Sequence, residues 1–336
     1  MRKTLLAAVG AAFLFTAPAS ASDNAPKEIL NVSYDIAREL YAAINPKFQA
    51  YWKDKTGQDI DIKQSHAGSS KQARAIMQGL KADIVTFNQV LDVQVLADRG
   101  GFVSKSWQQD LPNNASPYFS LPAFLVREGN PKGIKDWSDL VRDDVKLVFP
   151  NPKTSGNARY TYLAAYAYAL EQNGGDDAKA REFVGKLLSN VAVFDTGGRG
   201  ATTSFVEREI GDVLITFEAE VENIRAKYGE DEYQRVVPSI SLLAEFPVAL
   251  VKKVAEKRGS VDVSKAYLDY LYSEEAQDII ASFNNRVHNE TVKAKYAENF
   301  PEVRLIRVED VFGSWDKANK THFAEGGVLD QVFTGN

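Results

Sequence analysis

The sequence predicts an α/β protein folded into two lobes. Short apolar strands alternate with helical segments in two series, and two apolar segments, at about residues 119–126 and 241–251, stand between the series. Because parallel strands need crossover helices, each lobe is expected to be a mostly parallel sheet flanked by helices. The two intervening segments are interpreted as hinge strands that cross between the lobes. One large sheet is the alternative arrangement.

The first series fills about the first 100 residues of the chain. Its strands are expected at 29–32, 60–62 and 83–87. The helix beyond Asp35 has apolar residues at helical spacing as far as Tyr51, and it is expected to stop before Gly57. Helices with an apolar face are also expected after the second and third strands, the last ending near Gly100.

The second series lies between the two hinge segments. Its strands are expected at 145–149, 191–194 and 213–217. A mostly apolar helix at 158–171 ends at Asn173 and Gly174, and another helix follows Gly200. We therefore assign residues 22–118 and 250–336 to lobe 1 and residues 127–240 to lobe 2.

The N-terminus, residues 1–21, is interpreted as a signal peptide. Arg2 and Lys3 are followed by an apolar run at 5–15 and by a small-residue site that ends at Ala21. This run is shorter than the roughly 20 residues that a membrane-spanning helix needs. We therefore expect export and cleavage near Ala21, with a buried N-terminal helix as the alternative.

The composition excludes some kinds of site. The sequence has no cysteine, so a thiol nucleophile and a thiolate metal site are excluded. Its three histidines, His66, His288 and His322, lack the spacing of a metal motif, so we expect no metal and no cofactor. The formal net charge of −5 argues against a nucleic acid or an anionic membrane as a partner.

Three loops rich in glycine and serine indicate an anion site. Each follows an expected strand and opens a helix; they are residues 68–70, 154–157 and 196–200. Free N–H groups at a helix start attract anions, and glycine lets the backbone approach closely. Parallel strands deliver such loops to one sheet edge. Ordinary helix capping is the alternative for each loop alone, but together the loops predict an oxyanion cleft.

The segments 33–35, 64–72, 151–159, 195–201 and 211–218 closely resemble the periplasmic sulfate/thiosulfate-binding proteins of bacterial ABC transporters. The resemblance covers nearly the whole mature chain. It implies the two-lobed periplasmic binding protein fold (type II) and a receptor that closes on its anion. Such a receptor presents the anion to a membrane permease driven by an ATPase. We expect a monomer in the periplasm.

The resemblance also implies the ligand contacts. They are the backbone of Asp35, the hydroxyl of Ser69, the hydroxyl and backbone of Ser155, and the backbone amides of Gly156, Asn157 and Gly198. All are neutral donors, which suits a dianion that carries no proton at neutral pH. Phosphate keeps a proton and would benefit from a carboxylate acceptor. Asp35 could fill that role, but a helix N-cap is the preferred interpretation of its side chain.

Two positions depart from the sulfate-type pattern and favour thiosulfate. Phe217 stands where that pattern has tryptophan, and Asn157 stands where it has glycine. With Gly198 and the pair Asn88 and Gln89, they resemble the thiosulfate-type branch. The terminal sulfur of thiosulfate is larger than oxygen and a poorer acceptor, so a phenyl ring can pack against it where an indole donor would be wasted. A purely structural Phe217 is the alternative.

Two arginines beside these loops, Arg159 and Arg199, are interpreted as supports that pair with acidic residues rather than as ligand contacts. No catalytic residue is expected. A secreted hydrolase on the same fold is an alternative, but these loops hold no base beside Ser69 or Ser155. A receptor for molybdate or tungstate is a further alternative that would need a roomier pocket.

Overall fold

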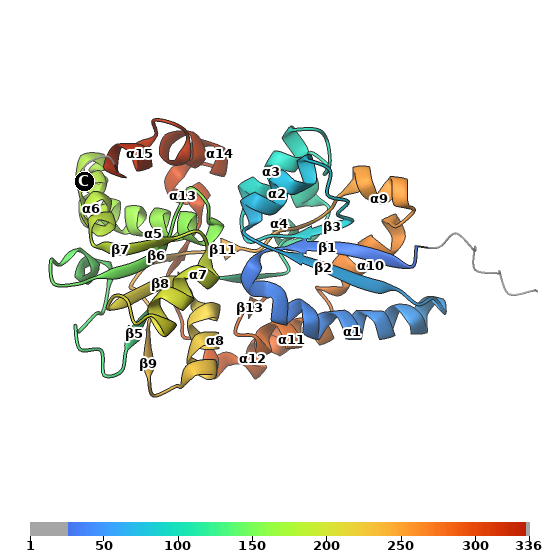
Figure 1. Cartoon of the computed structure of the whole chain (residues 1–336), viewed down its shortest axis with the longest axis horizontal. Coiled ribbons are helices and arrows are strands. Elements are labelled where there is room, and N and C mark those ends of the chain that lie inside the picture. Colours follow the sequence, from blue (N-terminus) through green and yellow to red (C-terminus); the bar gives the residue numbers. More distant parts are fainter. Residues whose placement is uncertain (1–25, 334–336) are drawn as a thin grey trace, which may run out of the picture.

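The computed structural model describes residues 26–333, and it consists of two lobes side by side, joined by crossing segments (Figure 1). The first lobe is built on a four-stranded sheet of order β12-β3-β1-β2. Strands β1 (Glu28–Ser33), β2 (Asp61–His66) and β3 (Ile84–Thr86) are parallel, whereas β12 (Val248–Leu250) is antiparallel to β3. The helices of this lobe are α1 (Arg38–Thr56), α2 (Ser69–Met77), α3 (Val90–Asp98), α9 (Lys252–Arg258), α10 (Val261–Tyr270) and α11 (Glu274–Ser282).

The helix α1 shows how local sequence sets an element. One face buries Leu40, Ile44 and Phe48, which recur at helical spacing. The helix ends at Gly57, which has a left-handed φ of 73° and donates its N–H to the carbonyl of Lys53 at 2.8 Å. The predicted stop before Gly57 is confirmed.

The second lobe is built on a five-stranded sheet of order β7-β6-β8-β5-β9. The three predicted strands are parallel; the sheet is extended by a strand antiparallel to them, and by an edge strand that is antiparallel to that one. The strands are β5 (Pro122–Arg127), β6 (Leu147–Pro150), β7 (Val191–Asp195), β8 (Val213–Phe217) and β9 (Tyr233–Val236), and the helices are α5 (Gly156–Gln172), α6 (Asp177–Ser189), α7 (Gly198–Thr202) and α8 (Glu218–Tyr228). The predicted class, parallel-containing sheets flanked by helices, is confirmed.

Three short strands lie between the lobes, and we call them the hinge strands. β4 (Tyr118–Ser120) pairs with β11 (Ala244–Glu245) and with β13 (Arg286–Val287). The two predicted crossing segments therefore contain β4, β5, β11 and β12. A third crossing was not predicted: the chain leaves β13 through α12 (Glu290–Lys295) and reaches β14 (Leu305–Ile306), which pairs with β10 (Ser241–Leu242).

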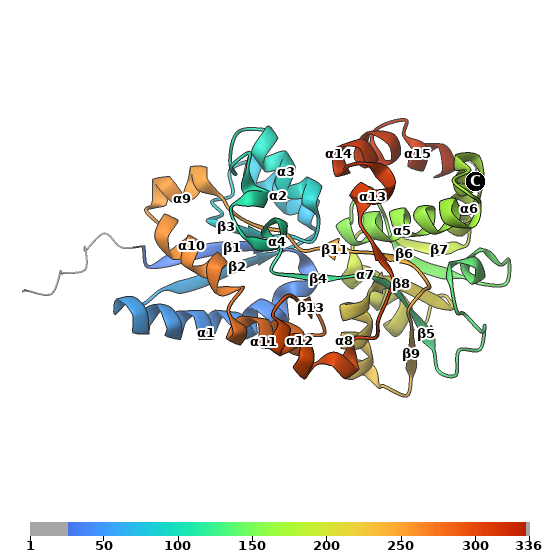
Figure 2. The same ribbon diagram turned by 180° about the vertical axis from the view of Figure 1, so that it is seen from behind.

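The C-terminal helices lie on the second lobe, although the sequence-based division placed residues 250–336 in lobe 1. In Figures 1 and 2 α13 (Val308–Phe312), α14 (Trp315–Ala318) and α15 (Val328–Phe333) lie beside α5 and α6. Lys153 Nζ lies 2.5 Å from Asp330 Oδ1, and the hydroxyl of Tyr162 lies 3.2 Å from His322 Nδ1. The apolar faces of these short helices do not reveal which lobe they cover. The lobe boundaries remain a proposal, which we revise by moving residues from about 305 onward to lobe 2.

The predicted signal peptide lies outside the described residues. Among residues 26–333, no helix combines the length and the hydropathy that a membrane span requires.

Candidate functional site

The glycine- and serine-rich loops of the two lobes meet at the lobe interface. A Cβ built on Gly156 would lie 2.7 Å from the Cβ of Gln89, and one built on Gly197 would lie 3.1 Å from Asp35 Oδ2. A Cβ on Gly68 would lie 3.5 Å from the carbonyl oxygen of Thr154. The loops after β1, β2 and β3 thus contact those after β6 and β7. The topology brings the predicted donors of both lobes to one place, because each loop leaves the carboxyl end of a parallel strand.

The first lobe contributes Ser69 at the start of α2 and Asp35 after β1. The Ser69 hydroxyl is buried; it donates to Asn88 Oδ1 at 2.6 Å and accepts from the Asn88 N–H at 3.3 Å. The helix N-cap predicted for Asp35 is wrong: the residue lies inside the short 3₁₀ turn Asp35–Ala37, and its Oδ1 accepts from the neighbouring Ile36 N–H at 3.0 Å. Burial raises the pKa of the Asp35 carboxyl, although Arg199 opposes the rise.

The second lobe contributes the starts of α5 and α7. Ser155 is the N-cap of α5, and its Oγ accepts from the Ala158 N–H at 3.5 Å, so its hydroxyl hydrogen is left for another partner. The Asn157 side chain donates to Thr216 Oγ1 at 2.9 Å inside the lobe. Gly156 and Gly198 are the first residues of their helices, and both are buried. Their position at helix N-termini suits an anion.

Phe217 ends β8 and is fully buried. Its ring packs edge-to-face against Phe246 at a centroid distance of 5.1 Å and against Tyr160 at 6.1 Å. Phe217 also lines a cavity of about 20 Å³ between the lobes, together with Tyr34 and Glu220. The residue is therefore a member of the aromatic core and a wall of an interlobe cavity at once.

Both arginines that the sequence assigned to loop support pair with acids of the other lobe. Arg159 Nη1 lies 4.0 Å from Asp92 Oδ1, and Ser70 donates to the same oxygen at 2.7 Å. Arg199 Nη2 lies 3.2 Å from Glu39 Oε2 and donates to the carbonyl of Asp35 at 3.4 Å. Two ion pairs thus connect the lobes beside the loops. The acidic partners lie far away in the sequence, so no spacing rule could identify them.

Sequence reasoning missed Glu220, which follows β8 and reaches the interface. The Thr202 hydroxyl lies 3.1 Å from its Oε1 and 3.2 Å from the carbonyl oxygen of Gly198, so the single hydroxyl hydrogen is shared between two acceptors. Burial raises the pKa of Glu220 to about 7, the hydrogen bond from Thr202 opposes the rise, and the charge of Asp35 adds to it. The carboxyl therefore titrates near neutral pH.

We expect Glu220→Gln to stabilise the protein more at pH 8 than at pH 5. The folded state keeps the proton up to about pH 7, whereas an unfolded glutamate releases it near pH 4.3, so wild-type stability falls as the pH rises between these values. Glutamine removes this loss. Urea unfolding at the two pH values measures it, with the exposed Glu232→Gln as a control of equal charge change. An equal effect of Glu220→Gln at both pH values would contradict the assignment.

The described residues do not place a base beside either serine. His66, the histidine near these loops, is held by the Tyr34 carbonyl at 3.0 Å from Nδ1 and by Gln64 Oε1 at 2.6 Å from Nε2. Residues 26–333 also contain no cluster of three or more His, Asp or Glu side chains that could hold a metal ion.

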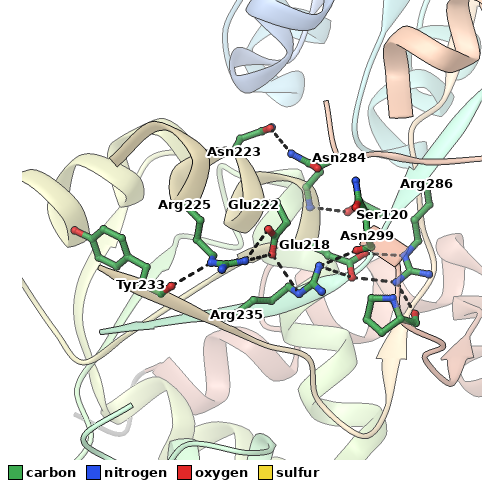
Figure 3. A network of polar contacts seen from close by, with 12 residues as sticks. Ser120, Glu218, Glu222, Asn223, Arg225, Tyr233, Arg235, Asn284, Arg286 and Asn299 are labelled. Carbon is green, nitrogen blue, oxygen red and sulfur yellow. Dashed lines mark hydrogen bonds and ion pairs between the residues drawn. The ribbon is translucent and has the colours of Figure 1, made fainter. Parts of the chain in front are cut away.

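A polar network ties the strand that ends at Phe217 to the hinge (Figure 3). Glu218 follows Phe217, and its side chain has no exposed surface. Arg286 of β13 donates to both of its carboxylate oxygens, at 2.7 and 3.0 Å, and Arg235 Nη1 lies 3.7 Å from Oε1. The Glu218 N–H donates to the carbonyl of Leu121 at 2.8 Å. A buried ion pair thus holds the start of α8 against the hinge strands.

Comparisons with known proteins agree with this architecture. The family model described as bacterial extracellular solute-binding protein matches residues 32–283. The chain is 58% identical over 306 residues to a thiosulfate-binding protein of Escherichia coli strain K12, covering 91% of this chain and 90% of the relative. It is 48% identical over 324 residues to a sulfate-binding protein of the same strain, covering 96% of this chain and 98% of the relative.

A solved structure of a sulfate-binding protein has the same fold. The sulfate-binding protein SubI from Mycobacterium tuberculosis H37Rv matches with a TM-score of 0.80 and 29% identity, over 88% of this chain and 99% of that one. This match confirms the predicted periplasmic binding protein fold of type II, and the relatives confirm the resemblance carried by the loop motifs. The chain therefore belongs to the bacterial extracellular solute-binding proteins, within the family of thiosulfate- and sulfate-binding proteins.

Proposed function

We propose that the protein is a periplasmic receptor that binds thiosulfate, with sulfate as the close second, between its two lobes. It delivers the anion to an ABC importer and breaks no bond in it. The observation that carries the proposal is the meeting of neutral donors from both lobes. The Ser69 hydroxyl lies on one side and would turn from Asn88 Oδ1 to the anion, and Ser155 with the starts of α5 and α7 lies on the other. Asp35, Asn157 and Phe217 complete the proposed contacts.

The charges around the loops support a dianion bound by neutral groups. Arg159 and Arg199 are each paired with an acid of the opposite lobe, so neither cation is left over for the ligand. Hydrogen bonds from hydroxyl and amide groups to an ionised partner are stronger than those between neutral groups. A fully deprotonated oxyanion can accept all of them, whereas an anion that retains a proton would lose one.

The surroundings of the serines support a receptor rather than an enzyme. The Ser69 hydroxyl is bonded to Asn88, and Ser155 Oγ caps α5, so neither is activated by a histidine in the described structure. The relatives carry the names of binding proteins. Membrane permease and ATPase partners, a monomeric state and a periplasmic location belong to the same proposal.

Calorimetric titration of the ligand-stripped mature protein tests the proposal. We expect tight, saturable binding of thiosulfate and sulfate without turnover, and no comparable binding of phosphate. Absence of binding to both sulfur oxyanions would refute the receptor assignment.

Replacing Phe217 by tryptophan is expected to shift the ratio of sulfate to thiosulfate affinity toward sulfate. An indole N–H would supply a donor that sulfate can use, and a donor to an ionised group contributes about 1.5–3 kcal/mol, or roughly 10- to 100-fold. The titrations above measure the ratio, with Phe205→Trp, a buried site in the core of the second lobe, as the control. An unchanged ratio in Phe217→Trp would show that Phe217 serves only the core.

A further inference from the structure

Gln89 lies where the two lobes touch. It precedes α3, has no exposed surface, and its Cβ would meet a methyl group on Gly156 at 2.7 Å. Its neighbour Asn88 holds the Ser69 hydroxyl. Gln89 therefore lies against Gly156, a proposed backbone donor of the other lobe, and follows in sequence the residue that holds Ser69, a proposed hydroxyl donor of its own lobe.

The side-chain amide of Gln89 has a hydrogen-bond partner at its oxygen but not at its nitrogen. Its Oε1 accepts from the Leu91 N–H at 3.1 Å and so caps α3. Because a backbone N–H can only donate, the oxygen must face it, and the NH₂ group is the part left over. The Nε2 atom is buried and has no hydrogen-bond partner among the described residues.

An unpaired buried donor costs about 1–3 kcal/mol, so its retention calls for a partner that is absent from the polypeptide. Two other buried amide nitrogens in the described chain also lack a partner, those of Asn31 and Asn45. Asn31 lies within β1 and Asn45 within α1, whereas Gln89 lies at the lobe interface. An anion held by Ser69 and Gly156 is the partner that this position favours.

We propose that Gln89 is a further ligand-binding residue, whose Nε2 donates a hydrogen bond to the bound oxyanion. The inference rests on the proposed function. It adds a neutral side-chain donor to the same set and involves no proton transfer. The amide is positioned in advance because the cap on α3 fixes its oxygen.

Calorimetric titrations of Gln89→Met and Gln89→Glu with thiosulfate and with sulfate test the proposal. Methionine keeps the size and removes the donor, so we expect affinity to fall about 10- to 100-fold. Glutamate keeps the capping oxygen and replaces the donor by a negative charge, so we expect a larger loss. Ser273→Ala, which removes the N-cap of α11 and none of the proposed ligand contacts, controls for loss of a cap and should bind like wild type. Circular dichroism shows that each variant is folded.

Two results would overturn the inference alone: Gln89→Met binding within about twofold of wild type, or Gln89→Glu binding as tightly as wild type, which would mean that the capping oxygen is all that matters. Failure of the wild-type protein to bind either anion would overturn the proposed function and this inference together.

Discussion

Gly156→Ala is expected to weaken anion binding about 10- to 100-fold while leaving the chain folded. The new methyl carbon would lie 2.7 Å from the Cβ of Gln89 and 2.8 Å from Asn88 Oδ1, both shorter than a normal contact. These atoms belong to the opposite lobe, so the overlap is relieved by moving the lobes apart. Such a movement separates Ser69 from the start of α5 and breaks up the set of donors. Calorimetric titration with thiosulfate measures the effect.

A second glycine provides the control for the general effect of the substitution. Gly185 lies inside α6, where an added Cβ would meet Val332 at an ordinary 3.8 Å. Gly185→Ala should therefore bind thiosulfate like wild type, with slightly higher stability because alanine favours a helix. Wild-type affinity in Gly156→Ala would mean that the lobes need not approach this closely to hold the anion.

Arg286→Met is expected to lower the free energy of unfolding by about 3–5 kcal/mol. The arginine donates two hydrogen bonds to the fully buried Glu218, and a further one to the carbonyl of Pro301 at 2.9 Å. Without it a buried carboxylate loses its main partner, and Arg235, at 3.7 Å, is too far for a hydrogen bond. Urea unfolding at neutral pH measures the loss.

Two further variants make this result interpretable. Arg304→Met removes an arginine from an exposed pair with Glu171 and should cost only about 0–1 kcal/mol. The double variant Arg286→Met with Glu218→Gln should be more stable than Arg286→Met alone, because the uncompensated charge is gone. A loss below about 1 kcal/mol for Arg286→Met would show that the hinge does not depend on this pair.

Much of the architecture could be predicted because it is local. The stop of α1 at Gly57 follows from spacing and turn chemistry within a few residues, and so does the opening of a helix after each of the loops at Ser69 and Ser155, although α5 begins at Gly156, two residues before the predicted 158. The class of site could be predicted for the same reason, since each loop carries its own glycine and serine. The motifs of these loops also carried the resemblance to the family.

Other features could not be predicted because they depend on which surfaces meet. The short helices beyond β14 have an apolar face that suits either lobe, and only packing decides between them. Phe312 and Trp315 contact Tyr166 and Tyr160 of α5, and α15 contacts α6. Asp35 has the residue type of an N-cap, yet the chain tightens into a 3₁₀ turn there and leaves it inside the turn. Glu220 lines a cavity together with Tyr34 of the other lobe, and its pKa is raised by burial and by the charge of Asp35.

By itself the sequence determined the α/β class, the loops with their neutral donors, and the likeness to sulfate- and thiosulfate-binding proteins. Each of these is a property of a residue and its near neighbours along the chain. Only the tertiary structure decided that loops from two lobes touch, that Arg159 and Arg199 pair across the interface, and that the Gln89 NH₂ group is buried without a partner. The physical reason is that distances, burial and hydrogen-bond partners are set by residues far apart in the sequence. The spacing of apolar residues shows only which face of a single helix or strand is buried.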